Sequence, residues 1–386
     1  MNLKRDYKSF DFVLLTLVCI TVIFGLIILG SISRNLEDVN RTFYKQQVFA
    51  ILGLIVLLAA AFIDYNFICK FIIPIYLVNL AMLVLVFVLP NAANENTNTA
   101  RWLELFGISV QPSEFSKIFM LIFLAALVDK YKGDINSPKI LLMIFALAIP
   151  PFILVLLQPS LSASVVVLVI LLIMLFNIGI SYKYIIAALA ITIPTIALFL
   201  YELFSGNRPV LNFLMEKDIL KPYHLERVDL LIKKDPNIDE YKQTYNSLNA
   251  IGSGGLFGKG LYNGTATKFG YIANNDNDFI VSAIGEELGF VGCVIAISLI
   301  FLIIIKCLLI AQKSPTTLGK SIILGIVGLL AFQTFANVCV ATDLLPNTGI
   351  PFPFISAGGS SLLVYMAMIG LVINIGMEKT KSIFEG

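Results

Sequence analysis

Charged residues are scarce in this chain, and their scarcity decides its class. Asp, Glu, Lys and Arg make up only 13% of the 386 residues, 58% are hydrophobic, and the mean hydropathy is +0.90. A soluble domain carries about 25% charged residues, so a soluble globular protein is excluded. The formal net charge of +2 is too small to indicate a nucleic-acid partner. The composition indicates an integral membrane protein, and we expect an all-α one.

Histidine and clustered cysteine are also lacking. His224 is the only histidine, which excludes a histidine-based metal cluster and leaves a Ser-His-Asp triad dependent on one residue. The five cysteines lie within or at the ends of apolar runs, where core packing is expected rather than disulfide bonding. Neither a histidine-bound metal nor a hydrolase triad is therefore predicted.

Long apolar runs are abundant. A membrane-spanning helix needs about 20 apolar residues, and the sequence predicts ten such helices within a single polytopic domain covering residues 1–386. The first has no cleavage site after it, so it is read as an uncleaved span. A large extracellular loop, 205–278, is predicted between the seventh and eighth. The predicted spans are 12–32, 44–63, 67–90, 112–131, 139–158, 161–180, 183–204, 279–311, 319–341 and 360–377.

The distribution of Lys and Arg among the short loops predicts the orientation. With the N-terminus inside, the inner segments hold thirteen of these residues and the short outer loops hold four: Arg34, Arg41, Lys45 and Arg101. Cytoplasmic loops are enriched in Lys and Arg. Both termini are therefore expected in the cytoplasm, and the loop 205–278 outside.

A helix start carrying two opposite charges lies in the fourth span. Pro112 suits a first helical turn, and Glu114 suits the positive end of the helix dipole. Glu114 and Lys117 are three residues apart and share one helical face. The spacing leaves two interpretations open: a structural ion pair that locks the helix to its neighbours, or a pair lining a wet cavity that receives an anionic substrate.

The glycines between residues 252 and 260 do not form a nucleotide-binding loop. The Walker pattern requires glycine at the position of Ser253 and Ser or Thr at the position of Gly260. A glycine loop that lets the backbone approach lipid or another helix is the better interpretation.

Asp278 follows at the mouth of the eighth span. An ionisable group at the membrane is costly unless it is paired or wetted, so a functional role is the default hypothesis. The structural alternative is that Asp278 caps the helix. Glu286 and Glu287 lie about two turns deeper, where one is expected to be a buried, paired structural residue. Asn337, in the ninth span, is expected to bond across helices.

Four segments together resemble a known family. They are QPSEFSK (111–117), GSGGLFGKGL (252–261), NDFIVSAIGEELGFVG (277–292) and LLPNTGIPFPFISAGGSS (344–361). They resemble the SEDS family of shape, elongation, division and sporulation proteins (RodA, FtsW and SpoVE), with a RodA-like member favoured. The resemblance implies polymerisation of lipid II into peptidoglycan at the outer face of the bacterial cytoplasmic membrane. It also implies a class B penicillin-binding protein as partner, besides membrane lipids.

The same resemblance assigns roles to individual residues. Asp278 matches the family's catalytic aspartate, Glu114 and Lys117 match a charged pair facing the same central cavity, and Arg101 matches an arginine of the preceding outer loop. Lipid II has an α-linked diphosphate and the polymer is β-linked, so each transfer inverts and needs one base. Asp278 is expected to act as that base or as ligand of a divalent cation, Mg²⁺ or Mn²⁺. Lys117 or Arg101 would then steady the diphosphate.

Several positions depart from the family's usual motifs. Asp276-Asn277 stands where His-Thr is usual, Ala357 replaces a tyrosine, and Ser160 lies where the motif after Gln158-Pro159 has aspartate. Asp276 is a candidate to raise the pKa of Asp278 or to share its metal ion. Two alternative functions stay open: a lipid II flippase or transporter, and a non-catalytic scaffold of the cell-wall synthesis complex. The sequence does not choose between elongation, division and sporulation.

Overall fold

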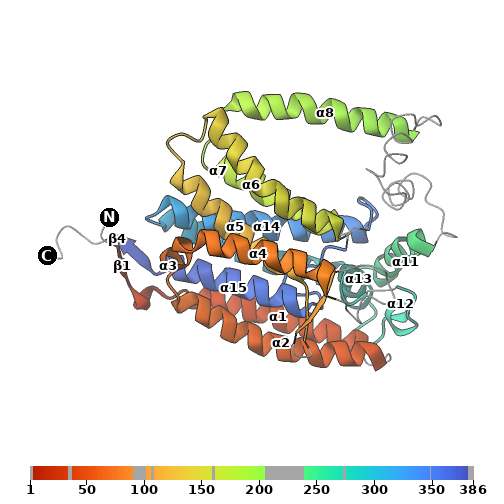
Figure 1. Ribbon diagram of the computed structural model, residues 1–386. Coiled ribbons are helices and arrows are strands. Elements are labelled where there is room, and N and C mark those ends of the chain that lie inside the picture. Colours follow the sequence, from red (N-terminus) through yellow and green to blue (C-terminus); the bar gives the residue numbers. More distant parts are fainter. Residues whose placement is uncertain are drawn as a thin grey trace.

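Helices that run along a common direction make up most of the molecule (Figure 1). The computed structural model describes residues 3–33, 37–89, 101–105, 108–158, 161–204, 239–272, 275–347 and 349–380. A helix occupies each apolar segment that the sequence predicts to cross the membrane. These helices are α1 (Phe12–Ser33), α2 (Glu37–Phe62), α4 (Ile72–Val88), α5 (Pro112–Lys130), α6 (Pro138–Leu157), α7 (Leu161–Asn177), α8 (Tyr182–Phe204), α13 (Ile280–Lys313), α14 (Thr317–Ala341) and α15 (Gly359–Gly376).

The helices differ in how well they fit a membrane. Within the described ranges, six helical segments are long and apolar enough to cross a bilayer, and α4, α7 and part of α8 are shorter apolar helices. The remaining one, α5, carries four charged residues. The membrane class is confirmed, and the number of ten crossings stays a prediction.

The structure differs from the sequence prediction in two details: one predicted span is interrupted, and short strands are present. The predicted third span is divided into α3 (Tyr65–Lys70) and α4, because Phe71 leaves helical geometry between them. Two antiparallel strand pairs accompany the helices: β1 (Leu3–Arg5) with β4 (Glu378–Thr380), and β2 (Leu103–Leu105) with β3 (Ile108–Val110). Each strand has three residues, so the molecule remains an all-α protein in class.

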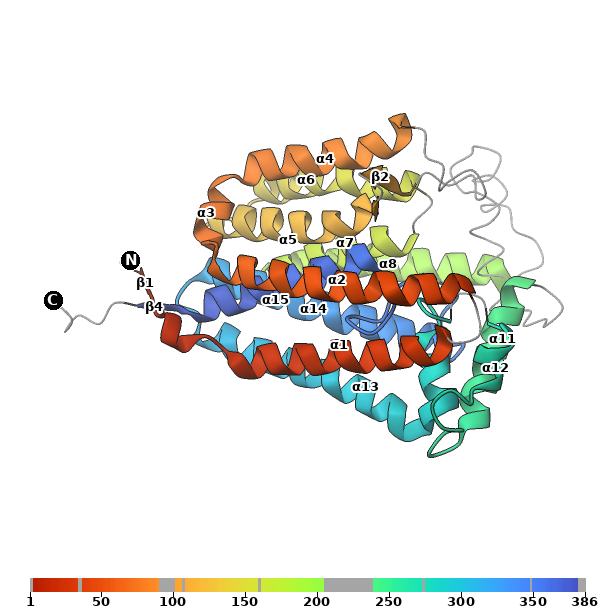
Figure 2. The ribbon, with the colours of Figure 1, turned by 90° about the horizontal axis from the view of Figure 1, so that it is seen from below.

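Both termini lie at one end of the bundle (Figures 1 and 2). There β1 pairs with β4, and Arg5 donates to the backbone carbonyl of Phe62 and to Asn374 Oδ1, both at 3.1 Å. The buried Asn374 in turn donates to the carbonyls of Ala61 and Ile63. A helix end that lacks intrahelical partners needs such donors, so these bonds fix both chain ends against α2.

The core follows α15, whose side chains are mostly buried. α15 packs along α2, and a Cβ at Gly370 would lie 2.4 Å from the carbonyl oxygen of Leu57. Small residues allow such close backbone approach between membrane helices. By contrast α8 stands apart from the bundle (Figure 1), and most of its described side chains are exposed.

At the opposite end, α11 (Asp239–Gly254) crosses the ends of the spans, followed by the short α12 (Thr265–Lys268) (Figure 2). Residues 205–238 of the predicted outer loop lie outside the described residues. Residues 252–254, expected in a glycine loop, are instead the last turn of α11. The expected close approach is confirmed: a Cβ at Gly254 would lie 1.9 Å from the carbonyl oxygen of Gly285, and one at Gly289 would lie 2.4 Å from the nitrogen of Gly258.

Glu286 ties this end together. Its carboxylate is fully buried and accepts bonds from Lys259 Nζ (2.7 Å) and from the backbone nitrogens of Thr265 (2.8 Å) and Ala266 (2.9 Å). A carboxylate at a helix start satisfies amides that have no intrahelical partner. Glu286 is thus the buried, paired structural residue that the sequence led us to expect.

Candidate functional site

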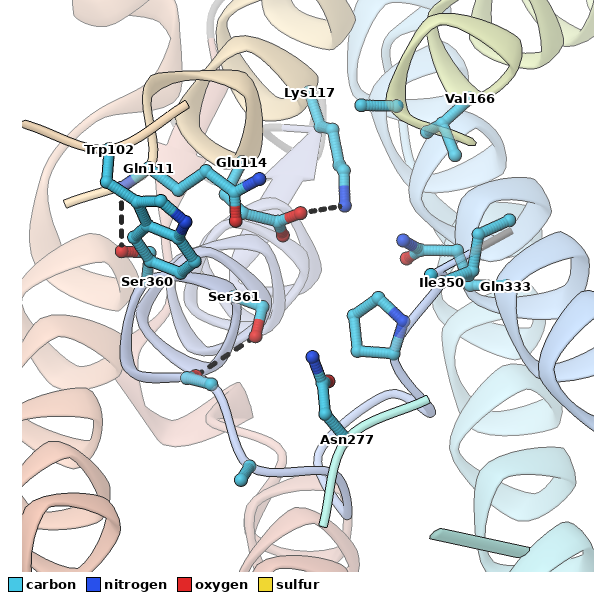
Figure 3. A pocket seen from close by; sticks show the side chains of 15 residues that line it. Trp102, Gln111, Glu114, Lys117, Val166, Asn277, Gln333, Ile350, Ser360 and Ser361 are labelled. Carbon is cyan, nitrogen blue, oxygen red and sulfur yellow. Dashed lines mark hydrogen bonds and ion pairs between the residues drawn. The ribbon is translucent and has the colours of Figure 1, made fainter. Parts of the chain in front are cut away.

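A cavity of about 100 Å³ lies at the starts of α5 and α15, and Figure 3 shows the side chains that line it. Five segments that are distant in sequence meet around it: Trp102 with the start of α5, α7, the turn before α13, the middle of α14, and the loop that leads into α15. The lining residues include Trp102, Glu114, Lys117, Asn277, Gln333 and Gly349.

The charged pair of α5 lies in the cavity wall. Lys117 Nζ is 2.6 Å from Glu114 Oε1, and the two side chains are 2% and 8% exposed. Glu114 Oε2 is buried and has no hydrogen-bond partner among the described residues. The pair is therefore a buried ion pair that also lines the cavity, and its contact with an anionic substrate stays a prediction.

Two helices begin at this cavity. α5 starts at Pro112 and α15 at Gly359, and Gln111 N donates to Ser360 Oγ at 3.2 Å, which joins the two starts. Helix N-termini concentrate partial positive charge and favour anions. Together with Lys117, they make the cavity suited to a phosphate-bearing ligand.

Gln333 reaches the cavity from α14. It is fully buried, and its Oε1 accepts a bond from Tyr365 OH at 3.0 Å, which leaves Nε2 as the inward donor. Neither Gln333 Nε2 nor Asn277 Oδ1 has a hydrogen-bond partner in the described part of the chain. Buried polar atoms are nearly always paired, so both atoms point to a ligand or to water in the cavity.

Asp278 lies in the turn 275–279, directly after Asn277, which lines the cavity; Asp278 itself is not one of the lining residues. Asn337 of α14 donates Nδ2 to the carbonyl of Asp278 (3.1 Å) and to that of Ile350 (2.7 Å). A Cβ at Gly349, which lines the cavity, would lie 3.5 Å from Asp278 Oδ2. Asn337 thus holds the turn against the loop before α15, where a bond between two helices was expected.

The structural alternative, in which Asp278 caps the eighth span, is wrong. The N-cap residue of α13 is Phe279, whose side chain makes no capping hydrogen bond. Phe279 is fully buried beside Ala250, Ile272 and Val340, and this anchor fixes where the preceding carboxylate lies.

Arg101 lies beside the cavity rather than in its wall. Its Nε donates to the carbonyl of Gln158 at 3.0 Å, and Gln158 Nε2 donates to the carbonyl of Leu83. The next residue, Trp102, lines the cavity and is 36% exposed. Arg101, just before β2, therefore joins this segment to the end of α6 and, through Gln158, to α4. A direct contact between Arg101 and a diphosphate stays a prediction.

The second aspartate of the turn has a different environment. Burial disfavours the charged form and raises the pKa of Asp276. Its carbonyl accepts a bond from Ala357 N at 2.8 Å, so it also joins the turn to the loop before α15. Within the described ranges no three His, Cys, Asp or Glu side chains group as a metal site. A divalent cation at Asp278 stays a prediction.

Sequence reasoning did not find the site role of Gln333 or of Tyr365. A glutamine and a tyrosine inside apolar runs are the only local signal, and that signal fits interhelical bonding equally well. The sequence indicates more clearly that the proline- and glycine-rich loop before α15 lies beside a cavity, because irregular backbone near a membrane is tolerated only against protein or a wet cavity.

The chain was then compared with known proteins. A family model described as "Cell cycle protein", which covers FtsW, RodA and SpoVE, matches residues 11–381. The chain is 30% identical, over 97% of its length and 95% of the relative's, to the probable peptidoglycan glycosyltransferase FtsW of Trichlorobacter lovleyi.

Two solved structures are similar over nearly the whole chain. One comes from a study titled "Structural coordination of polymerization and crosslinking by a peptidoglycan synthase complex", with a TM-score of 0.76, 26% identity, and coverage of 95% of this chain and 97% of that one. The other is an aspartate-to-alanine mutant of the rod shape determining protein RodA of Thermus thermophilus. Its TM-score is 0.66 at 25% identity, again with coverage of 95% and 97%.

Proposed function

Since this chain belongs to the family of FtsW, RodA and SpoVE cell cycle proteins, we infer that it is a membrane-embedded peptidoglycan glycosyltransferase of bacterial cell-wall synthesis. One observation in the structure carries this inference further: the buried Glu114–Lys117 pair and the Asp278 turn meet at one cavity. The cavity supplies a carboxylate, a cation and two helix N-termini where a lipid-linked sugar diphosphate would react.

The reaction transfers a sugar from its diphosphate to a hydroxyl of another sugar with inversion at the anomeric carbon. Asp278 takes the proton of the attacking hydroxyl as the new glycosidic bond forms and the bond to the diphosphate breaks. Lys117 and the starts of α5 and α15 offset the charge that develops on the departing diphosphate. Glu114 holds Lys117 through its 2.6 Å contact.

The size of the cavity limits what it holds. Sites for drug-sized ligands measure about 300–1,000 Å³, whereas this one measures about 100 Å³. The cavity therefore accommodates the reacting diphosphate or one sugar, and the rest of lipid II extends beyond it into the bilayer and the outer aqueous face. A small cavity that holds only the reacting group suits a substrate whose lipid tail lies in the bilayer and whose polar head extends into water.

We extend the proposal to orientation and partner. The site end faces outward and both termini face the cytoplasm, as the Lys and Arg distribution predicts. A class B penicillin-binding protein is the proposed partner, and the structural similarity to a peptidoglycan synthase complex supports it.

The test is polymerisation of labelled lipid II by the purified chain, with and without its cognate class B penicillin-binding protein. We expect glycan strands from wild type and none from Asp278→Asn, because an amide cannot accept the hydroxyl proton. Asp276→Asn is the matched control, two residues away in the same turn, and is expected to keep most of the activity.

Loss of activity in Asp276→Asn alone would move the catalytic role to Asp276. No strands from any form, partner included, would favour a transporter or a scaffold. The same assay with a chelator separates the two roles of Asp278: unchanged activity supports a base without metal, and activity restored by Mg²⁺ or Mn²⁺ supports a metal ligand.

A further inference from the structure

A second cavity lies at the opposite end of the bundle, where the termini meet. It measures about 400 Å³ and is formed by the start of α1, the last turns of α13 and α15, and β4. Its floor includes the buried Ile310 and Ile375, and its polar wall includes Asp11, Lys306, Lys313 and Glu378. The volume falls within the about 300–1,000 Å³ of small-molecule sites, and the proposed glycosyltransferase reaction does not use this cavity.

Of the four charged side chains in this wall, Lys306 and Asp11 form an ion pair, whereas Lys313 and Glu378 do not pair with each other. Lys306 Nζ is 3.0 Å from Asp11 Oδ2, and Asp11 Oδ1 accepts a bond from Leu14 N, so that pair is internally satisfied. Lys313 is exposed, and no ion pair joins Lys313 or Glu378 to a described residue. Among the described residues, Lys313 therefore has no ion-pair partner, and Glu378 is held by hydrogen bonds from uncharged donors only.

Neighbouring donors orient the Glu378 carboxylate. Asn66 Nδ2 donates to its Oε1 at 3.0 Å, and Tyr65 OH donates to its Oε2. Glu378 is only 7% exposed. An anionic headgroup would meet this fixed negative charge, whereas an ammonium group would be attracted to it.

Exposed apolar side chains on one side of α13 lead to this cavity. Leu309 lies in the cavity rim and is 45% exposed, and Leu302, two turns earlier on the same face, is also 45% exposed. An acyl chain lying on these leucines would place its headgroup at the level of Lys313. Long Lys side chains extend towards the headgroup region in this way.

We propose that this cavity binds the headgroup of a zwitterionic phospholipid with a primary ammonium group, phosphatidylethanolamine, from the leaflet on the side of the termini. Lys313 contacts the phosphate, and Glu378 accepts hydrogen bonds from the ammonium. The bound lipid lies against β4, α1 and α13 together and so fixes the paired chain ends to the bundle.

The test is native mass spectrometry of the purified chain with added phosphatidylethanolamine, phosphatidylglycerol or phosphatidylcholine of identical acyl chains. We expect wild type to retain phosphatidylethanolamine about tenfold more than either other lipid, the factor that one charge-assisted contact of about 1.4 kcal/mol represents. Lys313→Gln is expected to lower that retention about tenfold, and Glu378→Gln to remove the preference among the three lipids.

Lys320→Gln is the matched control, since Lys320 is an exposed lysine of α14 at the same end and outside the cavity lining. Equal or stronger retention of phosphatidylglycerol by wild type would overturn the proposal, as would equal losses in Lys313→Gln and Lys320→Gln. If Glu378→Gln fails to fold because of its contact with Tyr65, the two lysine variants decide. The readout needs no polymerase activity, so it stands apart from the proposed function.

Discussion

At the scale of single residues, the Glu114–Lys117 pair is a buried ion pair for which we also propose a chemical role. Breaking a buried pair leaves an uncompensated charge and destabilises by about 3–5 kcal/mol, whereas replacing both members with neutral groups is often tolerated. The pair is almost fully buried, so this asymmetry applies to it. Stability and activity can therefore be separated by comparing single and double variants.

We expect Glu114→Gln and Lys117→Met each to lower the thermal unfolding temperature in detergent, and the double variant to recover most of the loss. Polymerisation of lipid II should be lost in the double variant despite its recovered stability, because the cation that we propose to offset the charge of the diphosphate is gone. If the double variant recovered both stability and activity, the pair would have a structural role only.

Gln333 provides a second prediction at this scale. Gln333→Leu removes the inward Nε2 donor with little change of shape, and Tyr365→Phe removes only the bond that orients the amide. A hydrogen bond to a charged group contributes about 1.5–3 kcal/mol, or about 10- to 100-fold in rate. We expect kcat/KM for lipid II to fall by that factor in Gln333→Leu and by less in Tyr365→Phe. An equal, small effect of both would contradict a substrate contact.

At the scale of elements, the junction of α11 with the start of α13 sets where Asp278 lies. Gly289 interrupts α13 with φ 68° and ψ −163°, a conformation essentially restricted to glycine. The interruption lets the segment after α11 pair with α13, since Phe290 N donates to the carbonyl of Gly255 at 2.9 Å and Gly260 N to that of Glu287. The position of the turn that carries Asp278 thus depends on close contact between the backbone after α11 and the backbone of α13.

Gly289→Ala is expected to destabilise this junction strongly, because its Cβ would lie 2.4 Å from Gly258 N and its φ is unfavourable for alanine. Gly252→Ala, in the helical part of α11 with open space around it, is expected to be neutral or slightly stabilising. Limited proteolysis between α11 and α12 measures the difference. Equal sensitivity of the two variants would show that the junction is not tightly packed.

At the scale of the whole molecule, the two ends of the bundle have distinct chemistry. One end gathers the cavity of the Glu114–Lys117 pair, and the other gathers both termini and the lysine-lined cavity. The proposed orientation places these ends on opposite faces of the membrane. That arrangement fits the proposed glycosyl transfer outside the cell and the proposed anchoring of the paired chain ends by a lipid on the inside.

Labelling of spheroplasts with a membrane-impermeant maleimide tests this orientation. We expect Ser253→Cys, on the exposed side of α11, to react, and Lys320→Cys, at the opposite end, to react only after the membrane is permeabilised. The chain with its five native cysteines alone provides the background. The reverse pattern would invert the topology and contradict an outward-facing site.

The sequence by itself determined whatever depends on local pattern. The low charge and long apolar runs established the membrane class and the positions of the helices, because span length and composition are properties of single segments. The three-residue spacing predicted that Glu114 and Lys117 share a helical face, and the glycines predicted a close backbone approach. Motif resemblance predicted a catalytic role for Asp278 without any knowledge of its surroundings.

Only the tertiary structure decided which residues meet. It placed Gln333 opposite Glu114 and Lys117, gave Glu286 its partners in Lys259 and Thr265, and turned Asn337 towards the Asp278 turn. These contacts join residues far apart in the chain and depend on how the helices pack against one another. Local patterns carry no record of that packing, so a buried glutamine in an apolar run looks the same whether it faces another helix or a substrate.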